Sequence, residues 1–403
     1  MQSNKLHDYP HTAGDLNVKK ELINYLEEIN ITNIEEDNLL ITASTTHGYT
    51  LILKSIIRPH DVIIIPTPTY GLFAYEPEKL GGTSQFIELK EELKWKLDLN
   101  ELENKIIEIN QHLQEKYSNL NYIPRVVAIY NQNPNNPLGV SLGRQETEYL
   151  EKFVRLCDKH KVLIIDDLVY RDSVYDEKKT ALPLATFNKY KDNIVTLFGI
   201  SKSYSLAGIR AGFVLGNQFI IQDMRDNIFL QMDSISMLSQ IALASVFNSR
   251  KNRSNYRKKY LKKIHKKYLY NLDIIKYFID GRKVISKESR KRIESKLNKN
   301  EIIKYGKGLP NITIYHNLIP EAGFFVLIDF TALKGKRIGD KKIKDDIDLI
   351  MQLYKKDKIK FLPGCSFAWN NENELIGRIT FSKESGILID NMKSLANIIH
   401  EVK

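Results

Sequence analysis

Short apolar runs that alternate with helical patterns constrain the fold of this chain more than any other feature of its sequence. The runs are rich in isoleucine, leucine and valine, which is typical of buried strands. The first five are residues 38–42, 61–65, 126–130, 162–165 and 193–198. Strands that alternate with helices pair in parallel, with helices on both faces of the sheet. We therefore predict an α/β protein built on a mostly parallel, doubly wound sheet.

Small or polar residues follow these runs, at the points where the strands are expected to end. In a parallel sheet the carboxyl ends of the strands share one edge, and ligands bind in the crevice outside that edge. Five side chains that can take part in chemistry are expected there: Ser44, Tyr70, Asn136, Asp167 and Lys202. The pattern predicts one ligand site along this edge and does not name the ligand.

The segment 199–212 carries the most specific chemical signal in the chain. It reads Gly-Ile-Ser-Lys-Ser-Tyr-Ser-Leu-Ala-Gly-Ile-Arg-Ala-Gly. Small residues surround Lys202 and Arg210, which lets the backbone approach a ligand closely. A lysine in this setting can form a Schiff base with an aldehyde cofactor, and an arginine can bind the phosphate of that cofactor. The alternative interpretation is an ordinary basic turn.

This segment resembles the lysine signature of the fold-type I pyridoxal-phosphate (PLP) enzymes of the class I/II aminotransferase family. The resemblance extends from about Tyr9 to the C-terminus and is weakest between residues 282 and 318. It implies the PLP-dependent transferase fold type I, with the doubly wound sheet in a large domain and a smaller α+β domain. We expect an N-terminal segment (1–28) that packs with the small domain or a partner subunit, a large cofactor-binding domain (29–275) and a small domain (276–403).

The resemblance implies roles for residues around the cofactor ring. Lys202, preceded by Ser201, is expected to hold pyridoxal 5′-phosphate as a Schiff base and then to act as a general base. By this resemblance Tyr70 is expected to stack on the ring, whereas its position alone is more typical of a buried loop tyrosine. Residues 133–139 match the family motif Asn-Pro-x-Asn-Pro-x-Gly. There Asn136 is expected to donate to the phenolic oxygen of the cofactor and to contact the substrate, whereas a rigid turn alone would explain the prolines and the glycine.

Two adjacent carboxylates follow the run 162–165. Buried carboxylates are costly unless they are paired, and a protonated pyridine nitrogen is such a partner. The family pattern Asp-x-x-Tyr places Asp167 under the ring nitrogen and Tyr170 on the phenolic oxygen. A metal pair formed by Asp166 and Asp167 is the weaker alternative, because adjacent strand residues point to opposite faces. No metal is expected.

The turn after the run 38–42 is expected to bind the phosphate of the cofactor. Ser44, Thr45 and Thr46 precede an apolar helix, and the first N–H groups of a helix are available to an anion. With Arg210 they would form the phosphate cup of the family, which usually has a glycine near position 44 where this chain has none. A plain Ser/Thr helix cap is the alternative.

Two further residues are assigned near the ends of the chain. Tyr9 matches a tyrosine that in the family reaches the cofactor phosphate of the other subunit, which implies a homodimer with active sites at the interface. A tyrosine packed at the start of a helix is the alternative, and the N-terminal arm before Tyr9 is shorter than is usual in the family. Arg378 matches the arginine that binds the α-carboxylate of the substrate, for which a guanidinium fork is suited. A salt-bridged strand residue is the alternative there.

Charge and cysteine content argue against several other classes of partner. The 403 residues carry a net charge of +11, and much of the excess lies in residues 250–267. Apolar or aromatic side chains recur there every four residues, so the lysines are interpreted as the solvated sides of a helix rather than as a nucleic-acid surface. The two cysteines show neither disulfide nor zinc spacing, and no stretch suits a membrane span or a signal peptide. We expect a cytoplasmic protein with no nucleic-acid or membrane partner.

The preferred function is the transfer of an amino group between an L-α-amino acid and a 2-oxo acid. The same scaffold also supports PLP-dependent amino-acid oxidases and cyclases of specialised metabolism and C–S β-lyases. Residues 366–369, before Arg378, somewhat resemble arginine oxidases, which keeps an arginine-like substrate open. A non-catalytic binding or regulatory homologue is the alternative of a different class, and the presence of Lys202, Asp167 and Arg210 argues against it.

Overall fold

The computed structural model describes residues 7–248, 251–369 and 372–402, which form two compact units. Unit 1 contains Met1–Asn135 and Val140–Leu261, and unit 2 contains Asn136–Gly139 and Lys262–Lys403. The long helix α8 (Lys251–Ile279) carries the chain from the first unit into the second. The domain boundaries expected from the sequence stay predictions.

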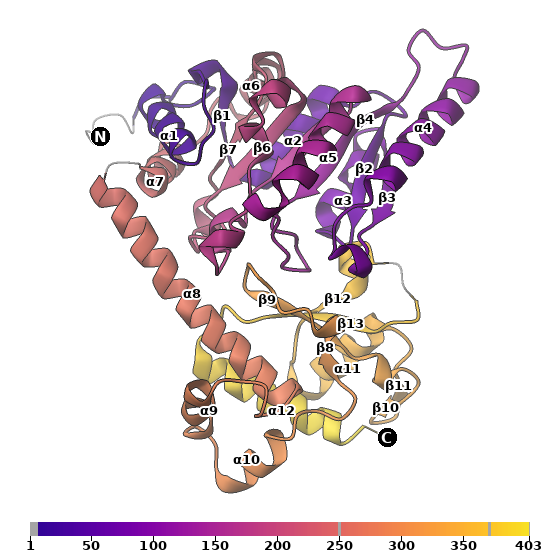
Figure 1. Cartoon of the computed structure of the whole chain (residues 1–403), viewed down its shortest axis with the longest axis vertical. Helices are drawn as coiled ribbons and strands as arrows, with labels where there is room; N and C mark the ends of the chain where they lie inside the picture. The colour runs from indigo at the N-terminus through magenta and orange to yellow at the C-terminus, as the bar shows by residue number, and fades with distance from the viewer. Residues whose placement is uncertain (1–6, 249–250, 370–371, 403) are drawn as a thin grey trace. The chain divides into compact units, whose positions relative to one another are not determined.

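Unit 1 is built on a seven-stranded sheet with the strand order β1-β7-β6-β5-β4-β2-β3 (Figure 1). The strands are β1 (Leu39–Thr42), β2 (Val62–Thr67), β3 (Thr83–Glu88), β4 (Val126–Gln132), β5 (Leu163–Asp167), β6 (Ile194–Gly199) and β7 (Gly212–Leu215). All pairs from β3 across to β6 are parallel, whereas β7 is antiparallel to both β6 and β1. The prediction of a mostly parallel α/β sheet is confirmed.

Helices cover both faces of this sheet. They are α1 (Leu16–Glu28), α2 (Thr45–Ile56), α3 (Gly71–Lys79), α4 (Leu99–Lys116), α5 (Thr147–Lys159), α6 (Gln218–Met232) and α7 (Met237–Phe247). Successive residues of β4 show the alternation, because side chains along a strand point to opposite faces. The ring of Tyr130 packs edge-on against Tyr49 of α2 and Phe73 of α3. The next residue, Asn131, donates its side-chain amide to Asp166, whereas Tyr130 donates to Asp167.

Helix starts in unit 1 follow the capping residues in the sequence. The carboxylate of Asp15 accepts the N–H groups of Asn17 and Val18 at the start of α1. Asp98 accepts the N–H groups of Asn100 and Glu101 at the start of α4 in the same way. Such caps satisfy backbone donors that have no partner within the helix.

Unit 2 combines a small antiparallel sheet with helices. The sheet has the order β12-β13-β9-β8, and a separate hairpin joins β10 and β11. The elements are β8 (Thr313–Ile314), β9 (Phe325–Asp329), β10 (Arg337–Ile338), β11 (Lys341–Lys342), β12 (Leu362–Pro363), β13 (Ile376–Thr380), α9 (Lys287–Glu294), α10 (Lys299–Tyr305), α11 (Asp346–Asp357) and α12 (Ser385–His400). No helix in the described part of the chain has both the length and the apolar character needed to cross a bilayer.

Two elements of unit 2 differ from their predicted extent. A helix is expected from the sequence over residues 340–354, but α11 begins at Asp346, because the β10–β11 hairpin uses the preceding residues and Asp345 caps the helix by accepting the N–H of Asp348. A strand is expected over residues 359–362, but β12 pairs with β13 only at Leu362 and Pro363. The pairing of β10 with β11 and of β12 with β13 depends on contacts between separate segments of the chain, which local sequence patterns do not specify.

Candidate active site

The C-terminal end of β1 lies at the same edge of the sheet as the C-terminal ends of the parallel strands of unit 1. Gly212, the first residue of β7, pairs with Thr42 of β1 on one side and with Gly199 of β6 on the other. Because β7 is antiparallel to both neighbours, β1 runs in the same direction as β6. Ser44 and Lys202, which follow β1 and β6, therefore lie at the same edge as the carboxyl ends of the parallel strands.

Two glycines of the lysine segment let the backbone of β6 and β7 pack directly against the first turn of α2. A Cβ atom on Gly212 would lie 3.0 Å from the backbone nitrogen of Thr45 and 3.0 Å from the carbonyl carbon of Ser44. A Cβ atom on Gly199 would lie 2.9 Å from Cγ2 of Thr45. The backbone contacts leave no room for a side chain at position 212, whereas a Cβ atom at position 199 would press on the methyl group of Thr45.

Ser44 caps α2 in a strained backbone conformation. Its φ angle is 129°, in a region that side chains disfavour and glycine adopts readily. Its hydroxyl oxygen accepts the N–H of His47 at 3.3 Å. Thr45 is buried and Thr46 is half-buried in the same first turn. The glycine that the family usually has near this position is thus replaced by a serine at a place where glycine would be free of strain.

The loop that carries Lys202 is anchored by a polar cluster behind it. Ser201 and Lys202 are half-buried, and Tyr204, two residues on, donates its hydroxyl to Oδ2 of Asp172 at 2.5 Å. Arg171 binds the other carboxylate oxygen of Asp172 at 2.7 Å. These bonds tie the lysine loop to the segment that follows β5.

Arg210 lies at the far end of the lysine loop. Its backbone is left-handed, with φ of 57°, and its side chain is exposed. Nη1 donates to the carbonyl oxygen of Ala207 at 3.0 Å. Arg210 directly precedes the Ala211–Gly212 step into β7, so it also lies at this edge of the sheet.

Asp167, the last residue of β5, is fully buried and accepts three hydrogen bonds. The hydroxyl of Tyr130 donates to Oδ2 at 2.7 Å, and Nε2 of Gln132 donates to the same oxygen at 3.2 Å. The backbone N–H of Val169 donates to Oδ1 at 3.0 Å. Burial raises the pKa of Asp167, while these three donors and the charge of Lys202 act to lower it. Lys202 is therefore close enough to influence the ionisation of this carboxyl group.

Asp166 is held on the other side of β5. Its Oδ1 accepts the side-chain amide of Asn131 at 2.8 Å, and its Oδ2 accepts the N–H of Leu184 at 3.0 Å. Burial raises the pKa of Asp166 to about 7. The two adjacent carboxylates therefore have separate partners. Within the described residues, no group of three or more His, Cys, Asp or Glu side chains is arranged to hold a metal ion.

The two tyrosines assigned to the ring differ in exposure. Tyr70 follows β2 and caps α3, its side chain is 37% exposed, and its ring meets that of Phe73 edge-on at 5.4 Å between centroids. Tyr170 is buried three residues after Asp167. An exposed ring at the edge of the sheet is available for stacking on a flat ligand, whereas Tyr170 offers only a small part of its surface.

Asn136 and Arg378 meet within unit 2. Nη1 of Arg378, on β13, donates to Oδ1 of Asn136 at 2.6 Å. The guanidinium carbon lies 5.0 Å from the ring centroid of Phe325 and 4.9 Å from that of Phe367. The two rings and the amide hold the guanidinium in one orientation, which suits the recognition of a planar carboxylate.

Tyr9 contacts none of these residues in unit 1. Its side chain is 86% exposed. Its predicted reach to the cofactor phosphate of a partner subunit stays a prediction.

Comparisons with known proteins decide the family. The sequence profile of the family described as aminotransferase class I and II matches residues 1–387. The chain belongs to this family. The chain is 23% identical over 403 residues to a probable aminotransferase of Arabidopsis thaliana, covering 98% of this chain and 75% of that one. It is 25% identical over 221 residues to the LL-diaminopimelate aminotransferase of Nitratidesulfovibrio vulgaris, a match that spans about half of each chain, 53% of this one and 51% of the relative.

Solved structures show the same fold. The aspartate aminotransferase of Rhizobium meliloti superposes with a TM-score of 0.74 at 18% identity, covering 98% of this chain and 84% of that one. The aromatic aminotransferase of Pyrococcus horikoshii gives a TM-score of 0.72 at 18% identity, covering 98% and 88%. The protein is an aminotransferase of PLP fold type I, and pyridoxal 5′-phosphate is the cofactor of its family.

The residues of this aminotransferase fit that cofactor. The buried carboxylate of Asp167 suits a protonated ring nitrogen, and Lys202 supplies an amine within electrostatic range of that carboxylate. The close packing of β7 on the first turn of α2 at Gly212 places a helix N-terminus, which suits a phosphate, at the same edge of the sheet as Lys202. Which residue contacts which group of the cofactor stays a prediction.

Sequence reasoning missed the residues that hold Asp167. Tyr130 and Gln132 are part of an apolar strand and its end, and neither belongs to a motif that we used. The signal that could have found them is the alternation of β4. Residues 130 and 132 share one face of this strand, and the motif asparagine Asn136 already indicated that the end of β4 lies near the site. The bond between Tyr204 and Asp172 left no comparable signal.

Proposed function

We propose that this aminotransferase moves an amino group between an L-α-amino acid and a 2-oxo acid, with Lys202 as the residue to which the cofactor is attached. The observation that carries the proposal is that the fully buried Asp167 ends β5 and Lys202 follows β6, the parallel strand beside it, at one edge of the sheet. A buried carboxylate is costly unless it has a charged or hydrogen-bonded partner. Asp167 already accepts three hydrogen bonds, and a cationic ring nitrogen would add the charged partner.

The chain's own groups supply the remaining chemistry. Released from the cofactor, the neutral amine of Lys202 would remove the proton from the Cα atom of the substrate. Bound PLP supplies a ring that accepts the electrons left on Cα when this proton departs. Asp167 would keep the ring nitrogen protonated, and Tyr70 would offer its exposed face for stacking. Tyr170 would act at the phenolic oxygen of the cofactor.

Anion recognition is assigned to two sets of residues. Ser44, Thr45 and Thr46 at the start of α2, with Ser201 and Arg210, would bind the phosphate of the cofactor. Arg378 would bind the α-carboxylate of the substrate, and Asn136, whose Oδ1 already accepts from this arginine, would present its Nδ2 as a donor. Arginine suits a carboxylate better than lysine does, because its fork can form two parallel hydrogen bonds.

The attachment is tested by borohydride reduction of the protein as purified, followed by peptide mass analysis. The proposal expects one added cofactor mass, located on the peptide that contains Lys202. Lys202→Ala should abolish the addition, while Lys178→Ala, at an exposed lysine, should not change it. A cofactor found on another lysine, or none in the wild-type protein, would overturn the assignment.

The reaction is tested with a panel of amino acids, first under nitrogen and then in air. Transfer predicts loss of the visible absorbance and release of one 2-oxo acid under nitrogen, without oxygen uptake in air. Oxygen consumption, above all with arginine, would favour the oxidase or cyclase. Pyruvate with ammonia from a sulfur-containing amino acid would favour the β-lyase. A spectrum that no amino acid changes would point to the non-catalytic homologue.

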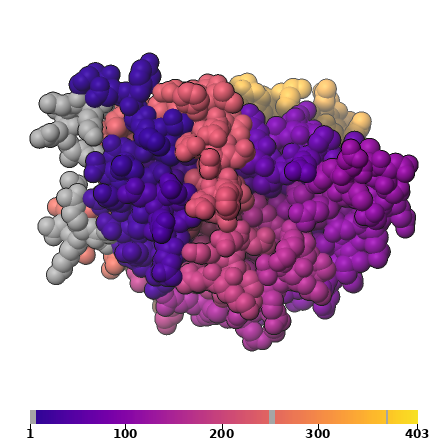
Figure 2. Space-filling view, turned by 90° about the horizontal axis from the view of Figure 1, so that it is seen from above, coloured from indigo at the N-terminus to yellow at the C-terminus, as the bar shows by residue number. Residues whose placement is uncertain are grey.

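We also infer a homodimer. Large apolar side chains are exposed around the junction of α6 and α7: Phe229, Leu230, Met232 and Leu238. Figure 2 shows the face of unit 1 on which the indigo N-terminal segment lies against salmon-coloured helices of this region, in agreement with the packing of α1 on α7. Exposed apolar clusters of this kind mark interaction sites, and a second copy is the partner that the family suggests. Leu230→Asp should shift the protein from dimer to monomer in light scattering.

We place the protein in the cytoplasm. Cys157 is buried, Cys365 is exposed, and neither forms a disulfide. Unpaired thiols are typical of a reducing compartment.

A further inference from the structure

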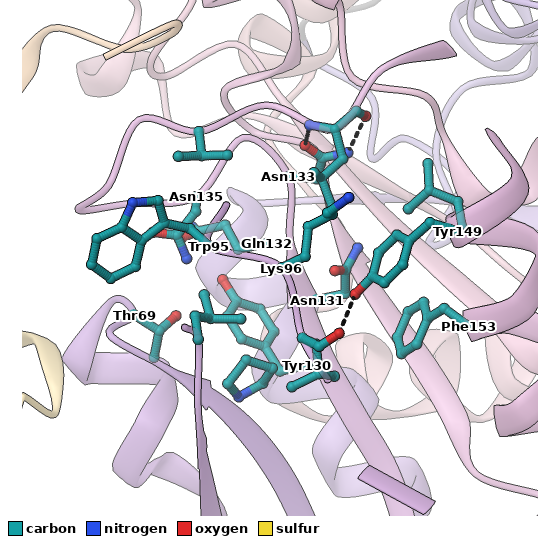
Figure 3. Close-up of a pocket in the computed structure, with 16 residues that line it drawn as sticks. Thr69, Trp95, Lys96, Tyr130, Asn131, Gln132, Asn133, Asn135, Tyr149 and Phe153 are labelled. Atoms are coloured by element: carbon teal, nitrogen blue, oxygen red, sulfur yellow. Dashed lines mark hydrogen bonds between the residues drawn. The ribbon is translucent and has the colours of Figure 1, made fainter. Parts of the chain in front are cut away.

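The carboxylate of Asp167 is oriented by two side chains from one face of β4. In the parallel pairing of β4 with β5, Gln132 lies opposite Asp167 and Tyr130 lies opposite Ile165. Residues two apart on a strand share a face, so both side chains approach the carboxylate from the same direction. They converge on one atom, Oδ2, at 2.7 Å for Tyr130 and 3.2 Å for Gln132. Figure 3 shows Tyr130 and Gln132 on one side of the cavity and Asn131 with Tyr149 on the other.

The ring of Tyr130 is held so that its hydroxyl keeps this direction. It meets the rings of Tyr49 and Phe73 edge-on, at 5.4 Å in both cases, and those two rings stack on each other at 4.3 Å. Tyr130 is also fully buried. A buried ring enclosed by two others cannot turn its hydroxyl elsewhere without repacking all three. Burial, and after it the negative charge of Asp167, raise the pKa of Tyr130 well above its usual value. The hydroxyl therefore keeps its proton and remains a donor.

The two oxygen atoms of the Asp167 carboxylate accept different numbers of hydrogen bonds. Oδ2 accepts two bonds, from Tyr130 and Gln132, whereas Oδ1 accepts one, from the N–H of Val169. A carboxylate oxygen can accept two hydrogen bonds. Oδ1 is therefore the oxygen with the more open position for a further donor.

We propose that Tyr130 and Gln132 are positioning residues: they hold Asp167 ionised and turn its Oδ1 toward the ring nitrogen of the cofactor. The inference rests on the function proposed above, because it takes Asp167 as the partner of that nitrogen. Hydrogen bonds to a carboxylate stabilise its charged form. Loss of a donor would make Asp167 a stronger base, which draws the shared proton toward the carboxylate and weakens the positive charge on the ring.

The first test compares Tyr130→Phe with Tyr49→Phe. The two tyrosines belong to the same buried aromatic cluster, and each hydroxyl makes a hydrogen bond, but that of Tyr49 goes to the backbone carbonyl of Phe73 at 2.9 Å and not to Asp167. The readouts are the dissociation constant of PLP, titrated into the apoprotein, and the pH midpoint of the visible absorbance of the bound cofactor.

Tyr130→Phe is expected to raise the dissociation constant of PLP roughly tenfold, as the loss of a hydrogen bond to a charged group should do. It should also move the midpoint of the visible absorbance to higher pH. A ring with less positive charge repels the proton on the nitrogen between Lys202 and the cofactor less strongly, so this proton is lost at higher pH. Tyr49→Phe should leave both values near those of the wild-type protein. Equal effects of the two variants, or no effect of Tyr130→Phe, would overturn the proposal for Tyr130.

The second test uses the adjacent residues of β4 and covers the case in which Tyr130→Phe does not fold. Gln132→Leu removes a donor to Asp167, whereas Asn131→Leu removes a donor to Asp166 on the opposite face. The absorbance midpoint should rise in Gln132→Leu and stay unchanged in Asn131→Leu. A midpoint that moves equally in both variants would contradict a specific role for this face of the strand.

These outcomes separate the present inference from the proposed function. If the wild-type protein binds no PLP and borohydride attaches nothing to Lys202, the proposed function is wrong. If the wild-type protein binds PLP on Lys202 but the Tyr130 and Gln132 variants match their controls, only the positioning roles are wrong.

Discussion

Nη1 of Arg378 lies 2.6 Å from Oδ1 of Asn136, and the guanidinium carbon lies over the rings of Phe325 and Phe367, 5.0 and 4.9 Å from their centroids. The arginine is therefore held by an amide on one side and by aromatic faces on two others. A lysine at this position could retain the charge but not the planar stacking or the forked geometry.

Arg378→Lys is expected to raise KM for the amino acid by a factor on the order of 30 or more, because a charge-assisted, geometrically matched pair is lost. The affinity for PLP should not change, since this arginine is assigned to the substrate. Steady-state kinetics and PLP titration measure the two effects. Arg337→Lys, at an exposed arginine of the same unit, is the control, and an unchanged KM in Arg378→Lys would contradict the assignment.

Replacement of Ser44 by glycine should stabilise the apoprotein. The φ angle of 129° costs a serine roughly 1–3 kcal/mol, whereas loss of its cap to glycine costs only a few tenths. Ser44→Gly is expected to raise the free energy of unfolding by about 1 kcal/mol, while Ser44→Ala keeps the strain, loses the cap and lowers this free energy by about 1 kcal/mol. Chemical denaturation measures both, and the opposite order of the two variants would argue against strain at this position.

The hydrogen bond from Tyr204 to Asp172 should contribute more to the free energy of unfolding than the hydrogen bonds made by the hydroxyl of Tyr260 nearby. Tyr204→Phe removes a hydrogen bond to a carboxylate and is expected to cost about 2 kcal/mol of unfolding free energy. Tyr260→Phe removes longer bonds, to the carbonyl oxygen of Tyr204 and the hydroxyl of Ser205, and should cost less than about 1 kcal/mol. Thermal and chemical denaturation decide the comparison, and equal losses would mean that the lysine loop is not anchored through Asp172.

Asp166 should make the protein less stable as pH rises toward neutrality. Burial raises its pKa to about 7 in the folded state, above the unfolded value of 3.8. Between these two pH values the folded state binds more protons than the unfolded state. The stabilising contribution of Asp166 to the free energy of unfolding is therefore fully present below the unfolded pKa and is lost as pH rises through the folded pKa. Between pH 5 and 7 the loss is on the order of 2 kcal/mol.

Asp166→Asn removes this titration. The asparagine can still accept the N–H of Leu184, and the amide of Asn131 can turn to accept from it. The unfolding free energy, measured by denaturation at several pH values, should lose its slope in this variant relative to the wild-type protein. A slope that persists unchanged would assign it to other groups.

Tyr9→Phe should weaken cofactor binding without destabilising the subunit. The side chain is 86% exposed, so the unfolding free energy should change by less than about 0.5 kcal/mol. The dissociation constant of PLP should rise roughly tenfold if the hydroxyl reaches the phosphate of a partner subunit.

A mixture of subunits decides whether this contact crosses the dimer. Hybrid dimers of Tyr9→Phe and Lys202→Ala subunits contain one site with an intact lysine and an intact partner tyrosine. Wild-type affinity should return in that fraction of sites. If the hybrids bind no better than Tyr9→Phe alone, Tyr9 does not act between subunits.

The local patterns of the sequence were sufficient for much of the fold and for the motif residues. The runs that became β2, β4, β5 and β6 are continuous apolar stretches, and such stretches remain strands whatever covers them. The lysine segment 199–212 and the acidic pair after β5 stand out because polar residues directly follow buried strands. These features depend on neighbours within a few residues, which is why a single chain reveals them.

Tertiary structure alone decided the rest. That β1 runs parallel to β6 follows from its pairing with β7, about 170 residues away in the sequence. The hydrogen bonds from Tyr130 and Gln132 to Asp167, and the bond from Arg378 to Asn136, each join segments whose registers the sequence does not state. A side-chain hydrogen bond depends on distances of a few tenths of an ångström between distant parts of the chain. The residue types therefore determined which chemistry is available, and the pairing of strands determined which atoms meet.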